Sequence, residues 1–171
     1  MINTAIPKFT MRFATKDDVA QILSFIKELA EYEKLAHEVV ATEETLAKTL
    51  FGERKVAEVI MGFYDAEPVG FMLFFHNYST FLAKPGIYLE DLYVKPQMRG
   101  KGIGKTMLSY LAKVAKERDC GRLEWWVLNW NTPAIDFYKS LEAQAMDEWT
   151  VFRLTDKTLN NLADSFNSNG Y

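Results

Sequence analysis

The sequence predicts an α/β fold in which a mixed, mostly antiparallel central sheet carries helices on both faces. Two apolar segments with strand composition, Val56–Tyr64 and Val69–His76, flank the turn sequence DAEP, which indicates an antiparallel hairpin. A third apolar segment, Gly86–Val94, is followed by a helical pattern and another strand-like segment. Such a strand–helix–strand unit is a right-handed parallel crossover, so the sheet is expected to be mixed.

The front half of the chain has the patterns of one strand and two helices. The segment FTMRFAT, Phe9–Thr15, has strand composition, and Thr15 followed by Asp18 resembles a capping box. Apolar residues then recur with helical spacing over residues 19–30. The segment TEETLAKTL predicts a second helix that starts at Thr42.

The back half predicts a strand, a helix and a last strand. These are RLEWWVLN at 122–129, TPAIDFYKSL at 132–141 and MDEWTVFRL at 146–154. The final segment SFNSNGY is polar, and such chain ends fray. We therefore expect one domain over residues 1–171, with a core at about 9–154 and a polar C-terminal tail at about 155–171.

The composition excludes several classes of protein. A net charge of -3 and a pI of about 5.5 argue against a nucleic-acid binder, which needs a basic face. No apolar run is long enough to span a membrane, and the first residues do not form a signal peptide. The single Cys120 allows no internal disulfide, so we expect a cytoplasmic protein. Cys120, His37 and His76 lie far apart in sequence, so no metal site is predicted.

A glycine-rich loop, MRGKGIGKT, spans residues 98–106 between a strand-like and a helical segment. It ends like a Walker A loop, but Arg99 stands where that motif needs its first glycine. The dinucleotide motif G-x-G-x-x-G fails as well, because its third position is Lys105. Glycines before a helix N-terminus favour a phosphate or pyrophosphate without favouring NTP hydrolysis. A glycine-rich turn with no ligand is the alternative.

Two adjacent carboxylates, Glu90 and Asp91, interrupt the apolar strand before this loop. Neighbours in an ideal strand point to opposite faces, so at least one acid should face an interior layer or a cleft. Burial raises a carboxylate pKa and makes the group a better base near neutral pH. The alternative places both acids in solvent at the strand end. Asn131, just before Thr-Pro, is typical of a helix N-cap.

These segments resemble the GNAT acetyltransferase superfamily. Its signature R-x-x-G-x-G/A at a helix start is matched by RGKGIG at 99–104. Four segments in order, IKELAEYEKL, YLEDLYV, RGKGIG and WNTPAIDFYK, resemble its diamine (spermidine/spermine) and thialysine acetyltransferase family. The similarity runs from Met11 to about Leu154. It implies a GNAT fold, with a splayed strand pair that binds acetyl-CoA.

The resemblance implies roles for individual residues. Tyr138 is the expected general acid, and Glu90 the expected base, acting through water. Acetyl-CoA contacts are expected from Leu92, Tyr93, Val94, Arg99, Gly100, Lys101, Gly102, Ile103, Gly104, Lys105 and Asn131. The amine site is expected to be lined by Tyr32, Glu33, Glu90, Asp91, Glu124, Trp125 and Trp126. An alkylammonium has a pKa of about 10.4, so such a base is needed before the amine can attack.

Three departures from the family pattern stand in the sequence. Polyamine-type members carry an acid-x-Trp pair upstream of YLED, whereas this chain has YSTFLAKP with Phe81 in the aromatic place. That segment is closer to the thialysine type. Glu142 stands where members of that family have glycine after the FYK helix. Glycine at this position avoids the cost of a positive φ angle, so we expect the helix to end differently here. The segment from Ala143 to Trp149 is shorter than in those relatives.

The predicted function is acetyl-CoA-dependent N-acetylation of a primary amine on a small molecule, by direct attack in a ternary complex. The acceptor class is a diamine, a polyamine or a lysine- or thialysine-like amino acid. The resemblance also implies a homodimer, while the charge, hydropathy and residue spacing given above predict no nucleic acid, membrane or metal as partner. Two alternatives stay open, a protein or peptide N-acetyltransferase and a non-catalytic acyl-CoA-binding domain.

Overall fold

The computed structural model describes residues 1–168, which belong to two compact units. The first unit is Met1–Leu128 and the second is Asn129–Tyr171. The first contains the whole sheet, and the second contains two helices and the segment between them. That the chain folds as one domain with a core at 9–154 stays a prediction.

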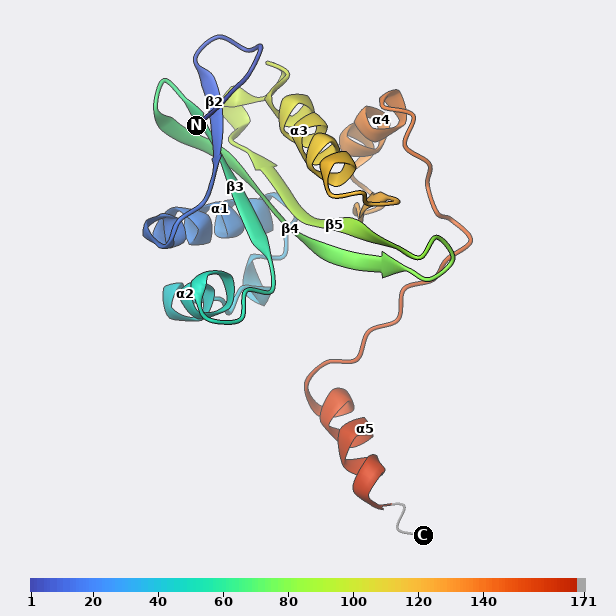
Figure 1. Ribbon diagram of the computed structural model, residues 1–171. Helices are drawn as coiled ribbons and strands as arrows, with labels where there is room; N and C mark the ends of the chain where they lie inside the picture. Colours follow the sequence, from blue (N-terminus) through green and yellow to red (C-terminus); the bar gives the residue numbers. More distant parts are fainter. Residues whose placement is uncertain (169–171) are drawn as a thin grey trace. The chain divides into compact units, whose positions relative to one another are not determined.

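A six-stranded mixed sheet forms the centre of the first unit (Figure 1). The strands lie side by side in chain order, and only the last pair, β5 and β6, is parallel. The predicted mixed and mostly antiparallel sheet is therefore confirmed. The strands are β1 Ile2–Asn3, β2 Phe9–Phe13, β3 Glu58–Tyr64, β4 Glu67–Ser79, β5 Lys84–Val94 and β6 Leu123–Trp125.

The β3–β4 hairpin turns at the predicted place. Asp65 and Ala66 have φ angles of 50° and 67°. Two successive left-handed residues are the geometry of a tight hairpin turn that matches the twist of the strands. The Asp65 carboxylate also pairs with Lys8 at 2.7 Å, which ties the turn to the residue before β2.

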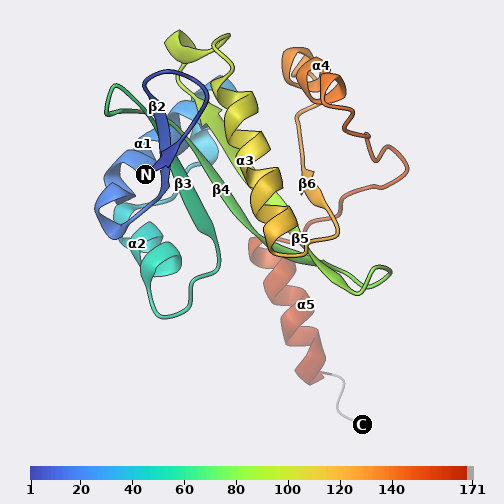
Figure 2. The ribbon, with the colours of Figure 1, turned by 45° about the horizontal axis from the view of Figure 1, so that its top comes forward.

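Helices cover both faces of the sheet (Figures 1 and 2). On one face lie α1, Val19–Tyr32, and α2, Glu43–Phe51, and on the other lies α3, Ile103–Glu117. Short 3-10 turns occupy Lys16–Asp18, Ala36–Glu38 and Pro96–Met98. No helix within residues 1–168 is long and apolar enough to cross a membrane.

Both predicted helix starts in the front half are confirmed. The Thr15 backbone N–H donates to the Asp18 carboxylate at 2.7 Å, which closes the capping box before α1. Thr42 caps α2, since its hydroxyl oxygen accepts a hydrogen bond from the Thr45 backbone N–H at 3.2 Å.

A core of aromatic rings fixes α1 against the sheet. The Phe25 ring of α1 lies 5.8 Å from the Phe71 ring of β4 and 5.6 Å from the Tyr93 ring of β5, measured between centroids. All three rings are almost fully buried. Large buried aromatic surfaces dominate core energetics, so the C-terminal part of β5 is held rigidly by α1.

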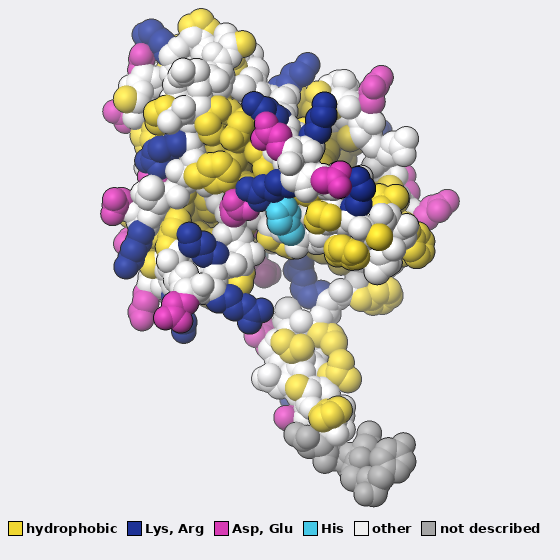
Figure 3. Space-filling model, in the orientation of Figure 1, with side chains coloured by type: hydrophobic (Ala, Val, Ile, Leu, Met, Phe, Trp, Pro, Cys, Tyr) yellow, Lys and Arg dark blue, Asp and Glu magenta, His cyan; other side chains and the backbone are white. Residues whose placement is uncertain are grey.

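The second unit departs from the predicted elements after its first helix. Helix α4, Thr132–Ser140, forms as predicted. The predicted strand at 146–154 is wrong, because no strand is formed over 143–155. A strand needs a hydrogen-bonded neighbour, and composition alone does not supply one. The predicted polar tail instead contains α5, Asp156–Ser168, which exposes Leu159, Leu162 and Phe166 (Figure 3).

Glu142 takes the helix-end conformation for which the family resemblance leads one to expect glycine. Its φ angle is 62°, in the left-handed region. Its N–H donates to the Lys139 carbonyl at 2.9 Å, and the Ala143 N–H donates to the Tyr138 carbonyl at 3.2 Å. These two bonds make a Schellman motif, so the end of α4 keeps its usual form despite the missing glycine.

Replacing Glu142 with glycine is expected to stabilise the protein by about 0.5–1 kcal/mol. The left-handed conformation costs a side-chain-bearing residue about 1–2 kcal/mol, and the greater freedom of glycine in the unfolded chain offsets part of that gain. Chemical denaturation at fixed pH measures the change. Glu142→Ala keeps the Cβ atom and should show no comparable gain, and equal stability of all three proteins would contradict the strain argument.

Candidate active site

The glycine loop between β5 and α3 has the backbone that an anion site requires. Gly100 and Gly102 have φ angles of 74° and 79°, which side-chain-bearing residues rarely adopt. A Cβ atom on Gly100 would meet no atom within 4 Å, so its conformation and not crowding explains the glycine. Gly102 is the N-cap of α3.

Both the N-terminus of α3 and the side chains of the loop carry positive charge. The first N–H groups of a helix have no intrahelical acceptor, and they carry the positive end of the helix dipole. Three exposed cations, Arg99, Lys101 and Lys105, surround this end of α3. Backbone donors, dipole and side chains thus all favour a negatively charged group such as a pyrophosphate.

A β-bulge interrupts β5 at the two adjacent carboxylates. Leu73 of β4 pairs with Asp91, and the next β4 residue, Phe74, pairs with Leu89. Glu90 is therefore the extra residue, and it breaks the regular alternation of faces. Glu90 is exposed, whereas Asp91 is mostly buried. The expectation that at least one of the two acids faces inward is confirmed for Asp91, and the alternative with both acids in solvent is wrong.

The strands β5 and β6 part at the same point. Their parallel pairing ends with Leu89 opposite Trp125, while β5 continues to Val94. Beyond the bulge, Leu92, Tyr93 and Val94 pair only with β4 within the first unit. The backbone edge that faced β6 is thereby freed for another partner, as expected for the splayed pair.

The Asp91 carboxyl has a pKa raised to about 7. The largest cause is burial, followed by repulsion from the neighbouring charges of Glu90 and Glu33. Glu33, which follows α1, also has its pKa raised by burial. The structure therefore brings together three of the predicted amine-site residues, Glu33, Glu90 and Asp91, as an acidic cluster, and none of the ion pairs within residues 1–168 includes any of them. Such a cluster attracts a cationic ligand.

Arg99 folds back from the loop onto aromatic rings. Its guanidinium lies 4.6 Å from the Tyr32 ring centroid and 5.9 Å from that of Tyr93, and its Nε donates to the Val94 carbonyl at 3.0 Å. The Tyr93 hydroxyl donates to the Glu28 carboxylate at 2.7 Å. These residues line a shallow pocket of about 360 Å³ made of Glu28, Glu31, Tyr32, Tyr93, Pro96 and Arg99.

Two of the predicted amine-site residues in and just after β6 have partners within the first unit. Glu124 pairs with Arg122 at 2.8 Å and accepts a hydrogen bond from the Asn77 amide at 2.8 Å. Trp126 is exposed, and its ring meets the Tyr88 ring edge-on at 5.6 Å. Trp125 is half-buried on β6. The structure thus gives Glu124 a structural role beside its expected one.

Two predicted site residues belong to the second unit. Asn131 is buried, and its side-chain oxygen accepts from the Ala134 N–H at 3.4 Å, so it is the N-cap of α4 as predicted. Tyr138 is half-buried on α4, with its ring 5.4 Å from the Phe137 ring. That these residues act together with Glu90 and the glycine loop stays a prediction.

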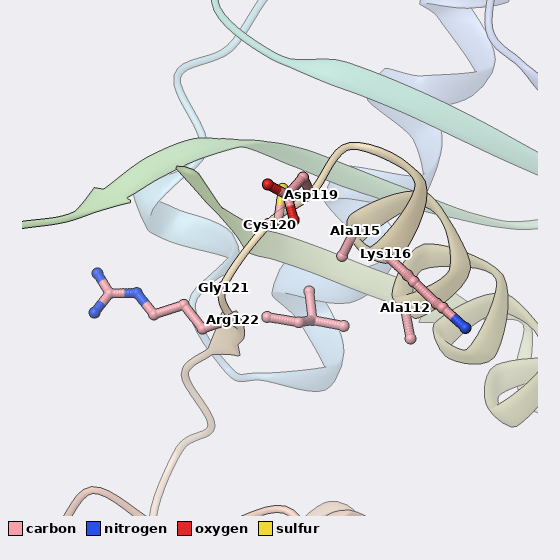
Figure 4. Close-up of a pocket in the computed structure, with 8 residues that line it drawn as sticks. Ala112, Ala115, Lys116, Asp119, Cys120, Gly121 and Arg122 are labelled. Atoms are coloured by element: carbon pink, nitrogen blue, oxygen red, sulfur yellow. The ribbon is translucent and has the colours of Figure 1, made fainter. Parts of the chain in front are cut away.

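A second hollow of about 300 Å³ lies where α3 leads into β6 (Figure 4). Its lining includes Lys116, Cys120 and Arg122. Lys116 and Arg122 extend in different directions, so they do not converge on one anion (Figure 4). Burial raises the pKa of the Cys120 thiol, which makes it a poorer nucleophile. The lining of this hollow includes neither the acidic cluster nor the glycine loop described along β5.

Sequence reasoning missed two residues of the site. Glu28 stands one helical turn before Tyr32, and this i, i+4 spacing could have placed both on one face of α1. Tyr64, at the end of β3, lies 5.6 Å from the Lys101 ammonium, measured to its ring centroid. No local pattern links Tyr64 to Lys101, because only the sheet brings the two segments together.

Comparison with known proteins is consistent with this geometry. Residues 22–142 match the Acetyltransferase (GNAT) family. The chain is 41% identical to the thialysine N-epsilon-acetyltransferase of Bos taurus, with 90% of this chain and 96% of the relative covered. It is 34% identical to the L-ornithine N5-acetyltransferase of Arabidopsis thaliana, with 87% and 85% covered.

A solved structure supports the same architecture. It is an integron cassette protein from the mobile metagenome of V. cholerae, with a TM-score of 0.77 and 28% identity. The match covers 91% of this chain and 98% of that structure. The predicted GNAT fold is therefore confirmed.

The charge of Asp91 should make the stability of the protein depend on pH. Its folded-state pKa of about 7 lies above the ordinary value of about 4, so the folded state holds the proton more tightly, and stability falls as pH rises from about 4 to about 7 and levels off above that. Asp91→Asn removes this penalty. Its free energy of unfolding should exceed that of the wild type by about 2–4 kcal/mol at pH 8 and be nearly unchanged at pH 4.

Denaturant titrations across that pH range measure the difference. Glu90→Gln is the matched control, because Glu90 is the exposed neighbour, and it should give a much smaller change. A difference between Asp91→Asn and wild type that does not vary with pH would mean that Asp91 is not held at a raised pKa.

Proposed function

Because the chain belongs to the GNAT acetyltransferase family, we propose that it transfers an acetyl group from acetyl-CoA to a primary amine of a small molecule. The observation that carries this proposal is the arrangement along β5. The carboxylates of Glu90 and Asp91, which take part in none of the ion pairs within residues 1–168, are followed along the same strand and loop by a cationic anion site at 99–104. The carboxylates suit an ammonium acceptor, and the cationic loop suits a pyrophosphate.

The donor side fits acetyl-CoA by its chemistry. We propose that the backbone N–H groups of the loop and of the first turn of α3 bind the pyrophosphate, together with the cations of Arg99, Lys101 and Lys105. The free edge of Leu92, Tyr93 and Val94 would hold the amide-bearing pantetheine arm by strand-like hydrogen bonds. When bound, acetyl-CoA supplies an activated acetyl group and a thiolate leaving group.

The acceptor side fits a cationic amine. Burial raises the pKa of both Asp91 and Glu33, and repulsion from Glu90 and Glu33 adds to the shift at Asp91; an ammonium group would lower both pKa values. We propose that these two residues bind and orient the acceptor, while Glu90, exposed on the bulge, takes its proton through a water molecule. Binding of the amine is then coupled to release of a proton from Asp91.

Acetyl transfer also needs hydrogen-bond donors for the thioester carbonyl and a proton donor for the departing thiolate. Backbone N–H groups of β5 beyond the bulge would polarise the carbonyl under attack. Tyr138 would donate a proton to the departing thiolate, since a phenol with a pKa near 10 is a competent acid for this step. Direct attack requires no covalent enzyme intermediate, so both substrates are bound together.

Among small amines, a lysine-, thialysine- or ornithine-like acceptor is the best supported. The relatives in cattle and Arabidopsis are named for thialysine and L-ornithine. The hairpin between β4 and β5 has Phe81 and no acid over 77–83, so it adds no carboxylate for the further charges of a polyamine. A diamine or polyamine acceptor, or a peptide amine, is the competing outcome of the assay below. A cytoplasmic location is part of the same proposal.

The predicted homodimer is also proposed here. Residues 146–154 have strand composition but form no strand, and they expose several large apolar side chains. Exposed apolar groups in such a cluster mark an interaction surface, and β6 lies at the edge of the sheet. We propose a second copy of this chain as their partner. The exposed side chains are Met146, Trp149, Val151, Phe152 and Leu154.

Free-thiol release from acetyl-CoA should depend on the added amine. A panel of putrescine, spermidine, spermine, lysine, ornithine, thialysine, an aminoglycoside and a lysine peptide identifies the acceptor class. The amino acids with a side-chain amine should give the highest kcat/KM. Thiol release only with the peptide would replace the small-molecule proposal, and none with any amine would oppose the acceptor assignment.

Substitution of Tyr138 tests the acid. Tyr138→Phe removes only the hydroxyl, so kcat should fall about 100-fold or more while the Kd for CoA stays within twofold. Tyr78→Phe, at an exposed tyrosine of β4, is the control and should behave like wild type. Unchanged turnover in Tyr138→Phe would assign the proton donor elsewhere.

Sedimentation velocity tests the dimer. The chain has a mass of 19.7 kDa, and the wild type should sediment at twice that mass. Phe152→Ser should shift the equilibrium toward the monomer, because it removes a large apolar side chain that is 91% exposed. Phe166→Ser, at an equally exposed position of α5, is the matched control. A monomeric wild type would refute the proposed pairing.

A further inference from the structure

Each of the two cations inside the glycine loop lies over the ring of a tyrosine. The Arg99 guanidinium is 4.6 Å from the Tyr32 ring centroid, and the Lys101 ammonium is 5.6 Å from that of Tyr64. Both distances are within the range of cation–π attraction. Tyr32 ends α1 and Tyr64 ends β3, so two separate elements reach the same loop.

The contacts restrict cations that would otherwise be free to move. Arg99 and Lys101 are exposed, and long exposed side chains lose rotamer entropy when they bind a ligand. A ring face attracts the positive charge without using its N–H donors. The Arg99 Nε donates to the Val94 carbonyl, and none of the ion pairs within residues 1–168 includes Arg99. The terminal nitrogens keep their donor capacity for an anion.

We propose that Tyr32 and Tyr64 are positioning residues that hold Arg99 and Lys101 ready for the pyrophosphate of CoA. This inference rests on the proposed acetyl-CoA function and assigns a role to two residues from different elements, α1 and β3. Tyr32 thereby acts on the donor side, whereas the family resemblance places it beside the amine. Tyr64 has no role in that resemblance.

The surrounding structure makes Tyr32 a fixed support. Glu28, one turn earlier on α1, accepts the hydrogen bond of the buried Tyr93 hydroxyl at 2.7 Å. This bond and the tilted contact between the Phe25 and Tyr93 rings join α1 to β5, directly before the loop. The end of α1, which carries Tyr32, is consequently tied to the strand that leads into the loop of Arg99. Pre-organisation of this kind raises affinity by reducing the entropy lost on binding.

Calorimetric Kd values for CoA test the proposal. Tyr32→Leu and Tyr64→Leu should each weaken binding about two- to fivefold, the size of one exposed cation–π contact. Tyr32→Phe and Tyr64→Phe keep the ring and should restore affinity to within about 1.5-fold of wild type. Tyr78→Leu, at an exposed tyrosine remote in sequence from the loop, is the control and should bind CoA normally.

A double-mutant cycle shows whether Tyr32 acts through its cation. In an Arg99→Gln background, Tyr32→Leu should have no additional effect on the Kd for CoA. The KM for acetylpantetheine, which lacks the pyrophosphate, should be the same in wild type, Tyr32→Leu and Tyr64→Leu. These readouts separate a positioning role from a general loss of structure, which would affect both donors.

Three results would overturn the assignment. The first is unchanged CoA affinity in both leucine variants. The second is an equal loss in the phenylalanine variants, which would implicate the hydroxyls. The third is a rise in the KM for the amine alone in Tyr32→Leu, which would leave Tyr32 only in the acceptor site. Failure of the wild type to bind CoA would instead refute the proposed function, and this inference with it.

Discussion

Leu89 pairs with Phe74 and Asp91 with Leu73, and the single residue left between them, Glu90, determines the shape of the site. The bulge turns one carboxylate outward and leaves its neighbour largely buried. It stands where β6 stops following β5, so the strand edge beyond it is open. An unbroken β4–β5 ladder would have kept the alternation of faces and pointed Glu90 and Asp91 to opposite sides of the sheet.

Repulsion between carboxylates destabilises the site, and packing elsewhere in the fold offsets this repulsion. The carboxylates of Glu33, Glu90 and Asp91 lie near one another, and burial is the main reason that the pKa of Asp91 is raised to about 7. The aromatic packing of Phe25, Phe71 and Tyr93 keeps this part of β5 in place against that repulsion. A cationic acceptor would relieve the repulsion, which gives the acidic cluster a functional reason to exist.

Negatively and positively charged side chains follow one another closely along the chain. Carboxylates at 90 and 91 are followed by the cations Arg99, Lys101 and Lys105 and by the positive end of α3. Each sign suits one of the two substrates of an acetyltransferase. Arg99 and Lys101 lie over tyrosine rings, and none of the ion pairs within residues 1–168 joins a loop cation to these carboxylates, so the two ends of the site do not neutralise each other.

Local patterns in the sequence were sufficient for the mixed sheet, the capped starts of α1, α2 and α4, and the anion loop. Each of these follows from periodicity, from a cap or from glycines with positive φ, which are properties of a few consecutive residues. Tertiary structure alone decided the bulge at Glu90, the burial of Asp91 and the place of Tyr64 beside Lys101. Register, burial and contact across a sheet depend on residues far apart in the chain. For the same reason residues 146–154, with the composition of a strand, form none without a neighbour to pair with.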